Sequence, residues 1–120
     1  MTSEGSRIIV HQEDKGVTRI EFVDRNILEE AAIQQIGEEI ASLIEPQASP
    51  KLLIDFTNVE HLSSAALGTL INVSNRIREK GGQLRLANID PQIYEVFVIT
   101  RLNKLFQIHD SNEEALATFK

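Results

Sequence analysis

The spacing of apolar positions changes several times along the chain, and each change predicts a new element. Residues 7–12 hold the apolar run Ile8-Ile9-Val10, and residues 17–22 alternate apolar and polar side chains as a half-buried strand does. The turn residues Asp14-Lys15-Gly16 lie between these segments, so together they predict a β-hairpin. The nearly unbroken apolar run at 51–56 predicts a buried central strand, of the kind that parallel sheets contain.

Four further segments repeat apolar side chains at three- and four-residue steps, which is the pattern of a helix with one buried face. They lie at about 28–44, at 65–80, after Asp90 and after Ser111. Asp90 precedes Pro91, and Ser111 lies three residues before a glutamate, so both residues fit as helix N-caps. The apolar stripe of the third helix is expected to comprise Ile93, Val96, Phe97 and Thr100.

Two more strands are predicted at 83–87 and 104–109, which gives the order β-β-α-β-α-β-α-β-α. Strands that alternate with helices favour an α/β fold in which helices pack on a mixed, mostly parallel sheet. The sequence therefore predicts one domain at 7–120, with four to five strands and about four helices. Residues 1–6 are polar and are expected to form a flexible N-terminus.

Composition narrows the range of functions without changing this fold prediction. The 120 residues are 42% apolar and 25% charged, as in a globular domain, and no apolar run reaches the ~20 residues of a membrane span. The net charge of −6 disfavours binding to nucleic acid. The chain has no cysteine, which excludes thiolate chemistry and fits a cytoplasmic location.

Few residues in the sequence suggest catalysis. The histidines His11, His61 and His109 are spread over the chain without metal-ligand spacing, so no metal site and no cofactor are predicted. A serine–histidine–acid triad can be drawn from Ser64, His61 and Asp55, but the glycines that flank the nucleophilic serine of many hydrolases are absent. A small serine hydrolase is therefore the weaker alternative to a non-catalytic protein.

The segment from Asp55 to Leu70 stands out because two serines lie where a helix begins. One hydroxyl, of Ser63 or Ser64, is expected to cap that helix. The small residues Ala65 and Ala66 follow, and they would leave a flat surface on which another protein could sit. Since free amides at a helix N-terminus favour negative charge, the fold itself would tolerate a phosphate on Ser64.

Several segments together carry a resemblance to a known family. They are the N-terminal hairpin, the long helix after Asn26, the strand 52–55, the glycine turn into the strand at 81–86, and the segments 100–106 and 111–116. The resemblance also includes the loop Ser63-Ser64-Ala65-Ala66-Leu67-Gly68. The chain resembles the STAS domain of bacterial anti-sigma factor antagonists, whose loop reads Asp-Ser-Ser-Gly-Leu-Gly.

The first serine of that family loop accepts phosphate. The resemblance therefore implies that Ser64 is the phosphorylated residue, with Ser63 as the less favoured candidate and the expected cap. Three positions depart from the family pattern, because Ser63, Ala65 and Ala66 replace its Asp, second Ser and first Gly.

What the resemblance implies is a regulator rather than an enzyme. Unphosphorylated antagonists of this family bind an anti-sigma factor, usually a serine kinase, and so free a sigma factor. Phosphorylation by the kinase ends the binding, and a phosphatase restores it. The departures in the loop leave open a second function, a constitutive STAS scaffold or ligand-sensing module of the stressosome-like or transporter-associated kind, without a phosphoswitch.

The partner surface is expected where the carboxyl ends of parallel strands meet, since loops converge there. Arginine at Ala66 is then expected to abolish partner binding and to leave thermal stability nearly unchanged. The expected contact residues are Asp24, Asn26, Glu60, His61, Leu62, Ser63, Ser64, Ala65, Ala66, Gly68 and Thr69.

Overall fold

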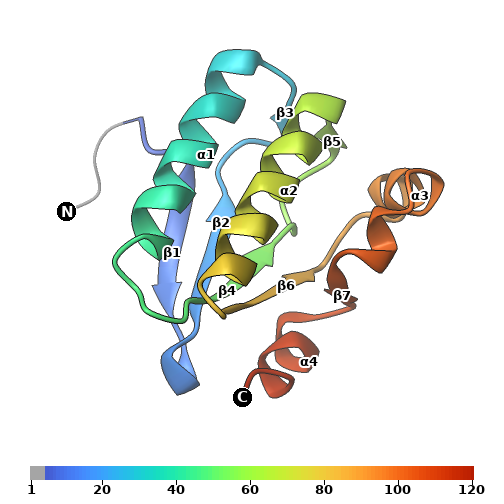
Figure 1. The fold of residues 1–120 in the computed structure, drawn as a ribbon. Helices are drawn as coiled ribbons and strands as arrows, with labels where there is room; N and C mark the ends of the chain where they lie inside the picture. Colours follow the sequence, from blue (N-terminus) through green and yellow to red (C-terminus); the bar gives the residue numbers. More distant parts are fainter. Residues whose placement is uncertain (1–4) are drawn as a thin grey trace.

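The computed structural model describes residues 5–120, and a five-stranded sheet lies at its centre (Figure 1). Its strands stand in the order β1-β2-β4-β6-β7. Strand β1 is antiparallel to β2, and every other pair in this sheet is parallel. The predicted hairpin and the mixed, mostly parallel sheet are thus confirmed. The strands are β1 (Ile8–Gln12), β2 (Thr18–Phe22), β4 (Lys51–Asp55), β6 (Gln83–Ala87) and β7 (Gln107–His109).

Four α-helices pack around this sheet, as predicted. Helices α1 and α2 lie side by side over one face (Figure 1). Ser111 and Asp90 cap their helices as expected, because each side chain accepts a hydrogen bond from a backbone amide of the first turn. The helices are α1 (Glu30–Ile44), α2 (Ser64–Glu79), α3 (Pro91–Ile99) and α4 (Asn112–Ala117).

Strand β4 is buried on both faces, which is why its sequence is a continuous apolar run. Leu52 and Ile54 point into the large core beneath α1 and α2, and both are fully buried. Leu53 points the opposite way, into a smaller core that α4 covers. That smaller core consists of Val17, Leu53, Ala87, Ala115 and Phe119.

Helix α3 departs from the predicted stripe. Ile93 and Phe97 are buried, and the Phe97 ring meets the Phe106 ring edge-on with centroids 5.8 Å apart. Val96 was expected on the same face but is 39% exposed. The helix lies at the margin of the fold and buries only Ile93 and Phe97, so the row that contains Val96 is left exposed (Figure 1).

The last strand begins later than predicted. Residues 102–104 form a 3-10 turn instead of extended chain, and β7 starts only at Gln107. Arg101 has a φ of 63°, which turns the chain sharply after α3 and leaves no room for a longer strand. Phe106 is buried as a core residue rather than as part of β7.

A second, two-stranded sheet lies beyond the end of the first. It pairs β3 (Asn26–Ile27) with β5 (His61–Leu62) in parallel, and neither strand was predicted. The sheet joins the chain after β2 to the chain after β4.

The flexible N-terminus predicted at 1–6 falls mostly on residues 1–4, which lie outside the described residues. At Ser6 the hydroxyl donates to the carbonyl of Ile8 over 3.0 Å. Within residues 5–120, none of the helices combines the length and the apolar character that crossing a membrane requires.

Candidate functional site

The small β3–β5 sheet brings together two segments that the sequence analysis assigned to one surface. The amides of Glu60 and His61 donate to the carbonyl of Arg25 over 2.7 and 3.2 Å. The amide of Ser63 donates to the carbonyl of Ile27 over 3.1 Å. Because β2 and β4 are parallel neighbours, the segments that follow them emerge at the same edge of the sheet and meet there.

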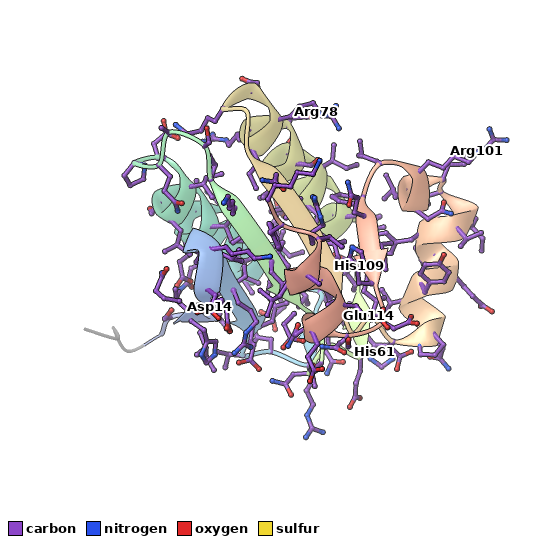
Figure 2. The ribbon with its side chains drawn as sticks, turned by 90° about the horizontal axis from the view of Figure 1, so that it is seen from below. Asp14, His61, Arg78, Arg101, His109 and Glu114 are labelled. Atoms are coloured by element: carbon purple, nitrogen blue, oxygen red, sulfur yellow. The ribbon has the colours of Figure 1, made fainter. Side chains whose placement is uncertain are left out.

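Side chains strengthen this junction. The ring Nδ1 of His61 lies 2.7 Å from the amide oxygen of Asn26, and it donates because that oxygen only accepts. Arg25 and Glu60 form an exposed ion pair with 3.6 Å between nitrogen and oxygen. His61 is exposed, and Figure 2 shows it at the periphery of the molecule. The junction therefore presents polar, solvent-accessible groups.

Ser63 is the N-cap of α2. Its backbone is extended, and its Oγ accepts from the amide of Ala66 over 3.2 Å. Its carbonyl accepts from the amide of Leu67, which closes the first turn. The prediction that one serine caps the helix is confirmed, and the structure assigns that role to Ser63.

Ser64 is the first residue of α2 and is exposed, as is Ala65 after it. In the described part of the chain, the Ser64 hydroxyl has no hydrogen-bond partner. The first turn of α2 carries no acidic side chain, unlike the first turns of α1 and α4. A negative charge added at Ser64 would thus be stabilised by the positive end of the helix dipole, and no carboxylate of the same turn would repel it.

Ala66 does not belong to the surface. It is only 5% exposed and packs beside Phe22, Ile27 and Leu62. The expectation that arginine at Ala66 would leave stability nearly unchanged is therefore wrong, since a guanidinium there would enter the core.

The other residues of the early α2 turns remain accessible. Gly68 and Thr69 are partly exposed, and a Cβ built on Gly68 would meet nothing within 4 Å. Asp24 is partly buried because Arg7 pairs with it over 3.2 Å. We call the accessible set the α2 edge patch: Asp24, Asn26, Glu60, His61, Leu62, Ser63, Ser64, Ala65, Gly68 and Thr69.

The serine–histidine–acid triad does not form. Asp55 is 3% exposed, and its carboxylate is held by other residues. His61 uses its Nδ1 on Asn26. Among residues 5–120, no hydrogen bond joins His61 to Ser64 or to Asp55. The arrangement lacks the base–nucleophile contact on which a serine hydrolase depends.

Asp55 has a different role, which sequence reasoning missed. Its Oδ1 accepts from the amide and hydroxyl of Thr57 and from the side chain of Asn88. Its Oδ2 accepts from the side chain of Asn112 over 2.9 Å and from Arg19 over 3.4 Å. One buried carboxylate thus fixes the start of the β4–β5 loop, the end of β6 and the first residue of α4.

These hydrogen bonds determine the charge state of Asp55. Burial by itself raises the pKa of a carboxyl group, because it disfavours the charged form. The hydrogen bonds from Asn112, Thr57 and Asn88 outweigh burial and hold the pKa of Asp55 below its ordinary value. The carboxylate is therefore ionised throughout the physiological range.

Comparison with known proteins agrees with this geometry. Residues 17–115 match the STAS domain family. The chain belongs to that family. Relatives of this STAS domain include BtrV of Bordetella bronchiseptica, a protein named as a candidate anti-sigma factor antagonist. It is 27% identical over 96 residues, which are 80% of this chain and 82% of BtrV.

Solved STAS domains share the fold. An anti-sigma factor antagonist domain protein from Planctomyces limnophilus superposes with a TM-score of 0.83 at 28% identity, over 92% of this chain and 95% of that one. The phosphorylated form of SpoIIAA from Bacillus superposes with a TM-score of 0.69 over 92% and 96%. Its identity is 19%, so that likeness concerns the fold alone.

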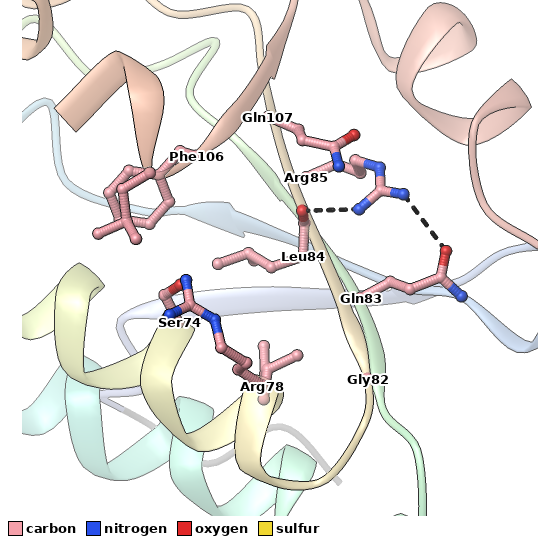
Figure 3. Close-up of a pocket in the computed structure, with 10 residues that line it drawn as sticks. Ser74, Arg78, Gly82, Gln83, Leu84, Arg85, Phe106 and Gln107 are labelled. Atoms are coloured by element: carbon pink, nitrogen blue, oxygen red, sulfur yellow. Dashed lines mark hydrogen bonds between the residues drawn. The ribbon is translucent and has the colours of Figure 1, made fainter. Parts of the chain in front are cut away.

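This STAS domain also has a hollow of about 260 Å³ away from the α2 edge patch (Figure 3). It lies between α2, β6 and β7, where Ser74 and Arg78 belong to the C-terminal half of α2. Arg85 beside it donates to the carbonyl of Leu84 and to the side chain of Gln83. The hollow is separated from Ser64 by most of the length of the helix, so it is not part of the candidate site.

Proposed function

We propose that this STAS domain is a non-catalytic regulator that binds an anti-sigma factor of the serine-kinase type and so releases a sigma factor. The names of its relatives support the general role. The observation that carries the proposal is the β3–β5 junction, which sets Asn26 and His61 beside the exposed first turn of α2. The partner contacts the α2 edge patch.

The switch in this proposal is phosphorylation of Ser64. The kinase transfers the γ-phosphoryl group of ATP to the Ser64 Oγ, the hydroxyl proton leaves, and ADP is released. The exposure of Ser64 supports this assignment, and so does the lack of a hydrogen-bond partner for its hydroxyl among residues 5–120. Ser63 is the poorer acceptor, since its Oγ caps the helix. The solved phosphorylated form of SpoIIAA indicates that a domain of this fold can carry a phosphate.

Phosphate at this position weakens binding through charge. It adds about −1.5 to −2 charges at neutral pH. The helix N-terminus tolerates that charge in the free domain. In the complex the group must pair with a cation or lose its water unpaired, and an unpaired buried charge costs about 3 kcal/mol or more. Each 1.4 kcal/mol is tenfold, so affinity falls by about a hundredfold or more.

Variants at the two serines test the switch. We expect Ser64→Ala to bind the partner kinase normally and to resist phosphorylation, and Ser64→Asp to bind about a hundredfold more weakly. Ser63→Ala is the matched control, which loses the cap but keeps the acceptor. The partner is first captured from the native lysate and identified by mass. Incubation with that kinase and ATP, followed by peptide mapping, then locates the phosphate, and a phosphatase should remove it.

The partner surface has its own test. Ala65 is exposed, so Ala65→Arg should abolish partner binding with the fold intact. Ala117 is an exposed residue of α4, so Ala117→Arg is the control for a positive charge added elsewhere on the surface. Full-strength binding by Ala65→Arg would remove the α2 edge patch from the proposal.

A second function rests on the loop composition. At the positions of Ser63 and Ala66, the loop that this chain resembles has Asp and Gly. A scaffold or ligand-sensing STAS module would not need the phosphorylation switch. Phosphate on neither Ser63 nor Ser64, together with capture of a permease or a multi-domain assembly, would favour that function over the first.

A further inference from the structure

Strand β1 forms an open edge of the main sheet. The amide of Val23 bonds to the carbonyl of Arg7, and the amide of Glu13 bonds to the carbonyl of Val17. In an antiparallel pair every second residue bonds to the neighbouring strand, so the residues between these ends alternate. Ile9 and His11 therefore bond to β2. The backbone groups of Ile8, Val10 and Gln12 point away from β2. The Ile8 carbonyl accepts from the Ser6 hydroxyl over 3.0 Å, and the Ile8 amide and both backbone groups of Val10 and Gln12 have no hydrogen-bond partner among residues 5–120.

Apolar side chains accompany these free backbone groups. Ile9 is 46% exposed and Val10 is 41% exposed. Helix α1 covers Ile8, which is 4% exposed, but it does not cover Val10 two residues further on. Exposed edge strands usually carry proline, lysine or a bulge that prevents pairing. Residues 7–13 contain neither proline nor lysine, and the pairing of β1 with β2 is regular.

From this edge we infer that the domain forms a two-fold dimer in which β1 pairs antiparallel with β1 of a second copy. The symmetry axis passes through Val10. The two five-stranded sheets become one continuous sheet of ten strands, in which the outward amides and carbonyls of each edge pair with those of the other, the Ile8 carbonyl accepting a second hydrogen bond beside that from Ser6. The occupant of this edge is the same chain, and the dimer leaves the α2 edge patch uncovered.

Self-complementarity selects this partner and this register. With Val10 opposite the partner's Val10, Ile8, whose backbone groups face outward, lies opposite the partner's Gln12. All five residues of β1 are then paired. Arg7 then lies opposite the partner's Glu13, so opposite charges meet at both ends of the interface.

Neighbouring registers are worse. An axis at Ile9 sets Arg7 opposite the partner's His11, and an axis at His11 sets Ile9 opposite the partner's charged Glu13. Both also shorten the paired region. All three registers match the backbone hydrogen-bonding pattern, and the register through Val10 is the one that pairs all five residues of β1 and sets opposite charges at both ends.

The interface is small, since each copy contributes one strand of five residues. Interfaces below the ~1,200 Å² of a standard complex are characteristic of weak, reversible association. We therefore expect a dimer whose population rises with protein concentration in sedimentation analysis. A monomer at every concentration up to the solubility limit would overturn the inference.

A cysteine on the symmetry axis gives a direct test, because the natural chain has none. Val10→Cys should form a disulfide-linked dimer under mild oxidation, since facing residues in a hydrogen-bonded antiparallel pair are about 5.5 Å apart at Cα, within disulfide range. Gln12→Cys is the matched control on the same strand. The two Gln12 positions lie about 13 Å apart along the strand direction, so that variant should stay unlinked. Equal cross-linking of both variants would exclude this register.

Charge reversal tests the ends of the interface. Arg7→Glu and Glu13→Arg each place two like-charged pairs in the dimer, and each should raise the dissociation constant about tenfold or more. The double variant restores opposite charges and should dimerise as the natural chain does. Arg7 also pairs with Asp24, and Glu13 with Arg19, so circular dichroism must first establish that each variant folds. A double variant no better than the single ones would refute the pairing.

Discussion

Asp55 carries its charge in a place that water hardly reaches, and it keeps that charge because four other residues donate to it. They are Thr57, Asn88, Asn112 and Arg19. The base of the loop that leads to Ser64 is therefore fixed by one carboxylate. A buried acceptor with donors on all sides is costly to replace, since its donors would be left without partners.

The first prediction at this scale is that Asp55→Asn lowers the free energy of unfolding by about 3 kcal/mol at pH 7. An asparagine amide keeps one oxygen, and its NH2 group would face donors on the other side, either Thr57 and Asn88 or Asn112 and Arg19. Urea unfolding followed by circular dichroism measures the loss. Asn58→Ala on the same loop is the control, because Asn58 is exposed and its one hydrogen bond is 3.5 Å long.

The pH dependence of that difference follows from the pKa of Asp55. In the unfolded chain this carboxyl titrates near 3.8, and in the folded chain its pKa is lower. As the pH falls, the unfolded chain takes up the proton first. The stability that the charged group provides is thus complete above about pH 3.8 and is lost as the pH falls toward the folded pKa. The difference in the free energy of unfolding between the natural chain and Asp55→Asn should be constant from pH 5 to 8 and should become smaller below pH 4. A difference that grows in acid would contradict this account.

Sequence reasoning succeeded at residues whose partners are local. The Ser63 cap could be predicted because its partner, Ala66, is three residues away. The Asp55 cluster could not, since Asn88 and Asn112 are 33 and 57 residues distant and no short pattern links them. Ala66 was placed wrongly because its small size was taken as a sign of surface, whereas the helix turns it inward.

At the scale of elements, the junction between α2 and β6 depends on two glycines. Gly81 has a φ of 70°, and its amide and that of Gly82 bond back to the last turn of the helix. A Cβ on Gly82 would lie 2.2 Å from the carbonyl oxygen of Pro50. That contact is with backbone, which cannot rotate away. The start of β6 can lie beside Pro50 only with glycine there.

A pair of glycine variants tests this junction. Gly82→Ala should lower the free energy of unfolding by about 2 kcal/mol or more, because the methyl group forces the strand away from Pro50. Gly68→Ala in α2 should raise it by about 0.5–1 kcal/mol, since the helix is favoured and the site is open. Chemical unfolding of both variants beside the natural chain decides the matter. Equal effects of the two substitutions would contradict the steric argument.

The elements that the sequence failed to predict have a common cause. Strands β3 and β5 have two residues each, too few for a periodic signal, and their pairing joins Asn26 to His61 across 35 residues. Helix α3 begins where it was predicted to, after Asp90, but has an unexpected exposed row. Periodicity identifies a helix from its own residues, whereas how much of it is covered depends on neighbours elsewhere in the chain.

At the scale of the whole molecule, the two faces of the sheet are closed very differently. Helices α1 and α2 cover one face with a large core. The other face has a small core, closed chiefly by α4 and by Phe119 after it. Phe119 is 2% exposed, and the guanidinium carbon of Arg85 lies 5.0 Å from its ring centre. The Nε of Arg85 also donates to the Thr118 hydroxyl.

This asymmetry predicts that the last residues contribute as much stability as a central core position. Phe119→Ala should lower the free energy of unfolding by about 3 kcal/mol, because a buried ring is lost and Arg85 loses the surface on which it stacks. Lys120→Ala, one residue later and exposed, should change it by less than about 0.5 kcal/mol. Figure 1 shows α4 at the opposite end of the fold from β5 and the start of α2. Phe119→Ala should therefore leave the partner's affinity for the folded protein unchanged. Urea unfolding and calorimetric titration below the unfolding transition measure the two quantities separately. A loss of affinity without a loss of stability would show instead that the C-terminal segment acts on the α2 edge patch.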